Sequence, residues 1–178
     1  MRKLIFLGFL CFYYFVFCVF TACSHSDDSV DVLIIGGGAS GVTAGIQSAR
    51  MGAATLIVEE TEWLGGMLTS AGVSAVDGNY DLPAGLFGEF REHLADYYGG
   101  LDSLKTGWVS AVLFEPSVGN KIFHEMVDAE KNLKVWHNAT LVKLEREKDV
   151  WIAQIQMKDN TIKKIHAKIL IDGTELGI

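Results

Sequence analysis

Three glycines near the start of the chain have the spacing of a loop that binds phosphate. Gly36, Gly38 and Gly41 form the pattern G-x-G-x-x-G. In this pattern Gly36 allows a tight turn, Gly38 lets the backbone approach a pyrophosphate, and Gly41 lets a helix pack closely on a strand. The helix N-terminus around Ala39 and Ser40 would present free N–H groups and a partial positive charge to the phosphates. These five residues predict a dinucleotide-binding site.

The segments on either side of the glycines are those that such a site requires. Residues 30–35 are apolar and mostly β-branched, which predicts a strand buried on both faces. Residues 42–51 favour a helix, and residues 54–58 predict a second buried strand. Glu59 ends that strand, where its carboxylate could accept hydrogen bonds from ribose hydroxyls. A carboxylate here also disfavours a ribose 2′-phosphate, which it would repel.

A second glycine pair points to the kind of dinucleotide. Four residues after Glu59 begins the segment 63–67, which contains Gly65 and Gly66. This doublet resembles the second signature of flavoproteins with two dinucleotide-binding domains; an ordinary glycine turn is the alternative. Together, residues 31–67 resemble the N-terminus of an FAD-dependent oxidoreductase, in particular the bacterial family related to the flavin subunit of heterodisulfide reductase. The resemblance implies that the cofactor is FAD and that the backbone of the doublet lies against it.

The end of the chain matches a later motif of the same family. A strand expected over residues 167–171 runs into Asp172, Gly173 and Thr174. The resemblance implies that these three residues form a turn where the returning strand meets the flavin side of FAD. Glu175 departs from the pattern, because glycine is commoner at that position. A simple strand-ending turn is the alternative interpretation.

The middle of the chain is expected to supply helices and a small antiparallel sheet. Helices are predicted over residues 84–98 and 116–131, followed by strands over 133–136, 140–147, 150–157 and 161–167. Short turns separate the last three strands, which indicates a β-meander. The predicted fold is therefore α/β, a Rossmann-like FAD-binding domain with a small antiparallel β-meander. A doubly wound sheet needs more strands after Asp172, so we interpret residues 31–178 as the incomplete N-terminal portion of that domain.

The first 22 residues have the features of a secretory signal. A basic start precedes the apolar run 4–20, and small residues lead to Cys23. The segment Phe20–Cys23 resembles a bacterial lipobox, although Phe20 stands where an aliphatic residue is usual. We therefore expect a lipid anchor at Cys23, a polar tether over residues 23–30, and export to the periplasmic or outer-membrane side of a bacterial envelope. The alternative is an uncleaved transmembrane anchor.

Composition excludes several classes of function. The chain has 178 residues and a net charge of −7; residues 1–22 hold two of its 15 basic residues and no acid, so the remainder carries −9. An acidic domain is a poor partner for nucleic acid. No cysteine follows Cys23, which excludes disulfides and thiolate clusters from the rest of the chain. No metal site and no catalytic side chain stand out among the remaining residues.

The sequence therefore predicts an FAD-dependent oxidoreductase that transfers hydride or electrons through the flavin to or from a small-molecule substrate or electron acceptor. Two alternatives remain. One is a truncated, non-catalytic Rossmann-like lipoprotein, and the other is an NAD-dependent enzyme.

Overall fold

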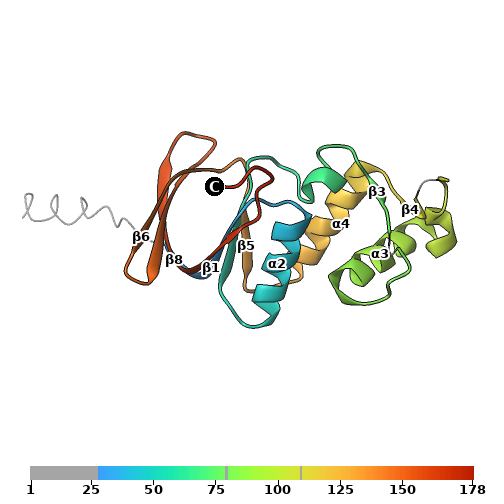
Figure 1. Cartoon of the computed structure of the whole chain (residues 1–178), viewed down its shortest axis with the longest axis horizontal. Coiled ribbons are helices and arrows are strands. Elements are labelled where there is room, and N and C mark those ends of the chain that lie inside the picture. Colours follow the sequence, from blue (N-terminus) through green and yellow to red (C-terminus); the bar gives the residue numbers. More distant parts are fainter. Residues whose placement is uncertain (1–27, 79, 109) are drawn as a thin grey trace, which may run out of the picture.

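A computed structural model describes residues 28–178 except residues 79 and 109 (Figure 1). The predicted signal segment, the lipid site at Cys23 and most of the predicted tether lie outside the described residues. Within the described part, no helix is both long enough and apolar enough to cross a bilayer.

One six-stranded sheet forms the centre of the fold, in the order β5-β2-β1-β8-β7-β6. Its strands are β1 (Asp28–Ile35), β2 (Thr55–Val58), β5 (Leu133–Trp136), β6 (Thr140–Glu147), β7 (Val150–Gln156) and β8 (Ile162–Asp172). The first four strands in this order are parallel, and β7 and β6 are antiparallel. The predicted α/β class, with parallel strands and an antiparallel meander, is confirmed.

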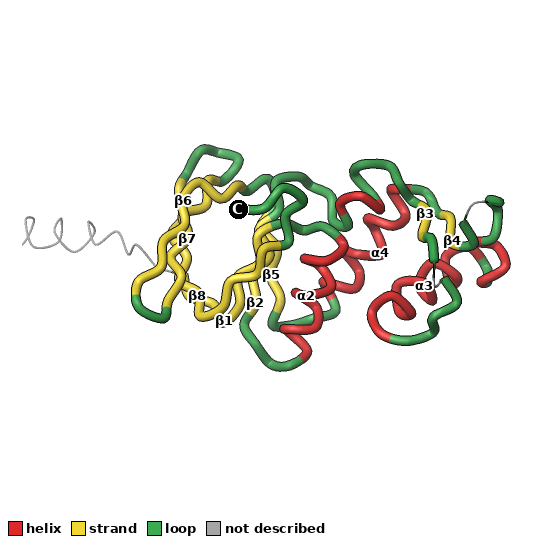
Figure 2. The backbone as a smooth tube through the Cα atoms, in the orientation of Figure 1, coloured by secondary structure: helices red, strands yellow, loops and turns green. Residues whose placement is uncertain are grey.

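The helices lie on one side of this sheet (Figure 2). They are α2 (Ala39–Arg50), α3 (Gly85–Tyr98) and α4 (Pro116–Asp128), with the 3-10 turns η1 (Gly66–Leu68) and η2 (Leu101–Leu104). Helix α2 packs on β1 and β2, α4 packs against α2 and β5, and α3 packs beyond α4. A two-stranded sheet of β3 (Ala75–Val76) and β4 (Val112–Leu113) lies beside α3. The three predicted helices are confirmed; α2 begins three residues earlier than the predicted 42–51, and α4 ends three residues earlier than the predicted 116–131.

Strand β1 separates two apolar cores. Val32 and Ile34 face the cluster that includes the helices, while Leu33 and Ile35 face a second cluster shared with β2, β7 and β8. All four side chains are buried. The sheet curves so that the meander comes round toward the face opposite the helices (Figure 2). Burial on both faces is the reason that this strand reads as an unbroken apolar run.

The structure corrects two predicted strand boundaries. The strands expected over residues 161–167 and 167–171 form the single 11-residue strand β8. Its first part pairs antiparallel with β7, and its later part pairs parallel with β1. No glycine or proline interrupts β8, so it passes without a break from the meander into the parallel sheet. Strand β1 also begins earlier than predicted, at Asp28 within the expected tether, because residues 28–30 pair with residues 165–167 of β8.

Strand β8 offers two isoleucines for a test of this core. Ile165 is fully buried in the second cluster, whereas Ile162 is 45% exposed in the same strand. We expect Ile165→Ala to lower the free energy of unfolding by about 2–5 kcal/mol, because it removes buried methyl groups and leaves a cavity. Ile162→Ala, the control, is expected to cost less than about 1 kcal/mol. Denaturant-induced unfolding measures both, and equal costs would contradict the described core.

Candidate cofactor site

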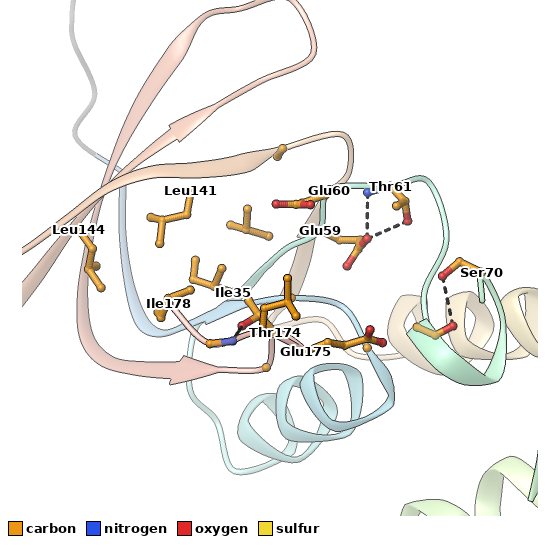
Figure 3. A pocket seen from close by; sticks show the side chains of 18 of the residues that line it. Ile35, Glu59, Glu60, Thr61, Ser70, Leu141, Leu144, Thr174, Glu175 and Ile178 are labelled. Carbon is orange, nitrogen blue, oxygen red and sulfur yellow. Dashed lines mark hydrogen bonds between the residues drawn. The ribbon is translucent and has the colours of Figure 1, made fainter. Parts of the chain in front are cut away.

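The carboxyl ends of three parallel strands meet at one edge of the sheet. Strand β1 leads into Gly36, β2 leads into Glu59, and β8 leads into Gly173. A cavity of about 620 Å³ lies at this edge (Figure 3). Its wall includes six of the predicted site residues, Gly36, Gly38, Glu59, Gly66, Gly173 and Thr174. The other predicted residues do not line the cavity but lie within three residues of one that does: Ala39, Ser40, Gly41, Gly65 and Asp172. The fold thus brings segments that are distant in the sequence together at one cavity.

Two of the motif glycines are required by the fold itself. Gly36 has a φ of +98°, and a Cβ there would lie 2.6 Å from the carbonyl oxygen of Gly173. The N–H of Gly173 donates to the carbonyl of Ile35 at 2.8 Å, which holds the end of β8 beside the loop. A Cβ on Gly41 would overlap the carbonyl oxygen of Gly36. Only glycine therefore lets the loop, α2 and the end of β8 approach so closely.

Gly38 differs, because none of the residues that the structure describes requires a glycine there. Its φ of −63° and ψ of 176° suit any residue, and a Cβ would meet only the Gly173 carbonyl oxygen, at 3.7 Å. Gly38 is the N-cap of α2, and no side chain caps that helix or places an acid in its first turn. The first N–H groups of a helix have no partner within it. Because Gly38 has no side chain, the cavity is open toward the free N–H groups at the start of α2, which can bind an anion.

Glu59 connects the glycine loop to the segment after β2. Its Oε2 accepts a hydrogen bond from the Gly37 N–H at 2.7 Å. Its Oε1 accepts from the N–H and the hydroxyl of Thr61, at 2.9 and 2.7 Å. Figure 3 shows Glu59 and Thr61 together at one side of the cavity. A carboxylate has about four acceptor positions, so Glu59 keeps capacity for a further donor.

The second glycine pair lies directly against the first loop. The N–H of Gly65 donates to the carbonyl of Gly37 at 2.8 Å, and Gly65 forms a β-bridge with Gly38. A Cβ on Gly66 would come within 3.1 Å of the Gly38 Cα. The backbone of Gly65 and Gly66 thus packs directly on the glycine loop of residues 36–38.

The turn after β8 is held by Asp172. Its Oδ1 accepts from the hydroxyl and the N–H of Thr174, at 2.7 and 3.0 Å, and its Oδ2 accepts from the Ile178 N–H at 3.1 Å. These bonds, the Thr174 hydroxyl foremost, hold the pKa of the Asp172 carboxyl below its ordinary value of 3.8. Glu175 lines the cavity, and its carboxylate lies near Gly66. Asp172 therefore shapes the turn, while Thr174 and Glu175 face the cavity.

The sequence did not indicate the apolar end of the cavity. Leu141 and Leu144 of β6 line it together with Ile35 (Figure 3). Strict alternation would put these two leucines on opposite faces of a strand. A register shift between Leu141 and Lys143 instead pairs them with Ile155 and Ala153, which share one buried face. Bulges of this kind occur next to functional sites, where they re-aim a side chain.

The arrangement defines a class of protein. A glycine turn between a parallel strand and a helix, an acid after the next strand and a meander beside the parallel sheet form a Rossmann-like domain of the flavoprotein type. The chain belongs to the FAD dependent oxidoreductase family, whose sequence profile matches residues 31–178. FAD is accordingly its cofactor. The open space at Gly38 and the polar and apolar ends of the cavity fit such a group.

Solved structures share this fold at low sequence identity. The chain resembles the myxobacterial chondrochloren halogenase, a FAD-dependent halogenase, at 12% identity and a TM-score of 0.60, covering 83% of this chain and 37% of that one. It resembles p-nitrophenol 4-monooxygenase from Pseudomonas putida at 13% identity and a TM-score of 0.58, covering 82% and 41%. It also resembles L-proline dehydrogenase from P. horikoshii at 18% identity and a TM-score of 0.50, covering 82% and 22%. The chain therefore spans less than half the length of each. No curated protein matches it.

Gly38, the N-cap of α2, and Gly41, in its first turn, should respond differently to a methyl group. We expect Gly41→Ala to lower the free energy of unfolding by about 3 kcal/mol, because its Cβ would overlap the Gly36 carbonyl. Gly38→Ala is expected to change it by about 0.5 kcal/mol or less, since its backbone conformation suits alanine. Denaturant-induced unfolding without cofactor measures both variants. A Gly41→Ala variant as stable as Gly38→Ala would contradict the described packing.

The turn at Asp172 should depend on pH. Because the carboxyl pKa is lower in the folded chain, its hydrogen bonds are complete above the ordinary value of 3.8 and are lost as pH falls through the folded value. We expect the amide NMR signals of Thr174 and Ile178 to shift together with a midpoint below 3.8. In Asp172→Asn this common titration should disappear. Independent midpoints for the two amides would contradict the shared carboxylate.

Proposed function

We propose that this chain binds FAD in the cavity at the edge of the parallel sheet, as the cofactor-binding part of an FAD-dependent oxidoreductase. The observation that carries the proposal is the open glycine position at Gly38, which faces the cavity at the uncapped start of α2. The pyrophosphate would lie on the loop of Gly36 and Gly38, near the N–H groups of Ala39 and Ser40.

The two ends of the cavity suit different parts of the cofactor. Glu59 has spare acceptor capacity and would accept hydrogen bonds from ribose hydroxyls. The apolar surface formed by Ile35, Leu141 and Leu144 suits a flat aromatic ring system. Gly66, Gly173 and Thr174 would contact the parts of FAD that lie between its ribose and its ring system.

FAD, when bound, supplies hydride or electron transfer, and the protein's residues bind and orient it. The other reactant would be a small molecule or an electron acceptor. The acidity of the chain after residue 22 argues against nucleic acid as a partner. We also propose the narrower kinship with the heterodisulfide reductase flavin subunit, which the motifs of residues 31–67, taken together, support. The lipobox-like segment supports a lipid anchor at Cys23 and a place in a bacterial envelope.

Flavin retention by the full chain tests the proposal. We expect the protein, purified in detergent because of its apolar segment 4–20, to retain FAD through gel filtration. Gly38→Asp should lose FAD, because the new carboxylate would occupy the place of the pyrophosphate and repel its negative charge. The variant should still fold, because the backbone conformation at residue 38 suits any residue. Gln47→Glu adds the same charge at an exposed position of α2 and should retain flavin.

Absorbance near the flavin maximum and thermal unfolding provide the readout. A folded wild-type chain that binds no FAD, or a Gly38→Asp variant that binds it equally, would contradict the proposal. Stabilisation by NAD instead of FAD would favour the NAD-dependent alternative, because a ligand of the folded state raises the melting temperature.

A further inference from the structure

The backbone of Leu64, which precedes the second glycine pair, is hydrogen-bonded by two polar side chains that do not line the cavity. The N–H of Leu64 donates to Oδ1 of Asn120 at 2.8 Å. The carbonyl of Leu64 accepts from the hydroxyl of Thr69 at 2.6 Å. Asn120 lies on α4, and Thr69 follows η1. Both backbone polar groups of this fully buried leucine are therefore fixed by side chains.

This position is connected to the proposed phosphate loop by one residue. Gly65, next in the chain, donates its N–H to the Gly37 carbonyl at 2.8 Å and bridges to Gly38. A displacement of Leu64 would therefore move Gly65, whose N–H is hydrogen-bonded to the carbonyl of Gly37. Glu59 holds the N–H of Gly37 from the other direction. The loop is thus located by two independent attachments.

The backbone of Leu64 is buried, so the loss of either hydrogen bond would leave a backbone polar group without a partner. Thr69 is 1% exposed, so its loss as a donor would leave the Leu64 carbonyl without a partner in a dry environment. The methyl group of Thr69 also packs in this region: a Cβ on Gly65 or Gly119 would lie 2.8 or 3.3 Å from it. Thr69 therefore contributes both a hydroxyl and a methyl group, and the two contributions can be separated by substitution.

We propose that Thr69 and Asn120 are positioning residues for FAD. They act through Leu64 and Gly65 to set the position of Gly37 and Gly38, and neither lines the cavity. Helix α4, which supplies no residue to the cavity wall, thereby controls the geometry of the cofactor site. This inference rests on the proposed function, because it assumes that FAD binds at Gly38.

Two substitutions of Thr69 distinguish the hydroxyl from the methyl group. Thr69→Val keeps the shape and removes the hydroxyl, while Thr69→Ser keeps the hydroxyl and removes the methyl group. We expect Thr69→Val to weaken FAD binding by about tenfold, the equivalent of one buried hydrogen bond, and Thr69→Ser to stay within about twofold of wild type. The Kd is measured by titrating FAD into the apoprotein (residues 1–178, in detergent) and recording flavin fluorescence. A greater loss in Thr69→Ser, or no loss in Thr69→Val, would overturn the proposal.

Asn120 provides a second pair. Asn120→Leu removes the acceptor for the Leu64 N–H, whereas Asn120→Asp keeps an acceptor oxygen. We expect the leucine variant to bind FAD about tenfold more weakly than the aspartate variant. Should Thr69→Val fail to fold, as judged by thermal unfolding of the apoprotein, this pair decides the question. Equal affinities of the two folded Asn120 variants would overturn the role of Asn120.

The Gly38→Asp variant separates this proposal from the proposed function. If wild type binds FAD and Gly38→Asp does not, then FAD lies at the loop, and unchanged binding in Thr69→Val overturns only the positioning role. If wild type binds no FAD, or Gly38→Asp binds it normally, the location of the cofactor is wrong and the positioning role is overturned with it.

Discussion

The close approach of three backbone segments at Gly36 determines the geometry of the site. The turn after β1, the first turn of α2 and the end of β8 meet there, and a side chain on Gly36 or Gly41 would occupy the space that the backbone fills. Because α2 starts so soon after β1, its N-terminus faces the edge where the parallel strands end. Because β8 ends against the same turn, Gly173 and Thr174 line the cavity beside the glycine loop. The remaining features of the site depend on this contact.

The glycine loop is also located by interactions that the motif does not contain. Glu59 binds the N–H of Gly37, and Gly65 binds its carbonyl, so that one peptide unit is fixed from two directions. Glu59 therefore has a role in the free protein in addition to the one proposed for it with FAD. Such a loop needs little rearrangement on binding, which reduces the entropy that a ligand must overcome.

Local sequence patterns predicted the parts of the structure that depend on residues close together in the sequence. The buried strands, the glycine turn, α2 and the acid at Glu59 follow from short-range periodicity and known backbone requirements. Other features depend on partners far away in the chain. The continuity of β8 requires β1 beside it, the shared face of Leu141 and Leu144 requires a bulge against β7, and the role of Thr69 requires a fold that brings its hydroxyl to Leu64. No spacing in the sequence signals these three features.

The pairing of β1 with β8 has a consequence for how the chain reaches its folded state. The ion pair between Lys168 and Asp31, across these two strands, joins residues 137 positions apart. One edge of β1 therefore has no partner until residues 165–172 of β8 have been synthesised. Long-range parallel pairing forms slowly, because loop closure precedes the contacts that compensate for it. An apolar strand with an open edge is prone to aggregate during that interval, so chaperones that cover such an edge would protect β1 until β8 pairs with it.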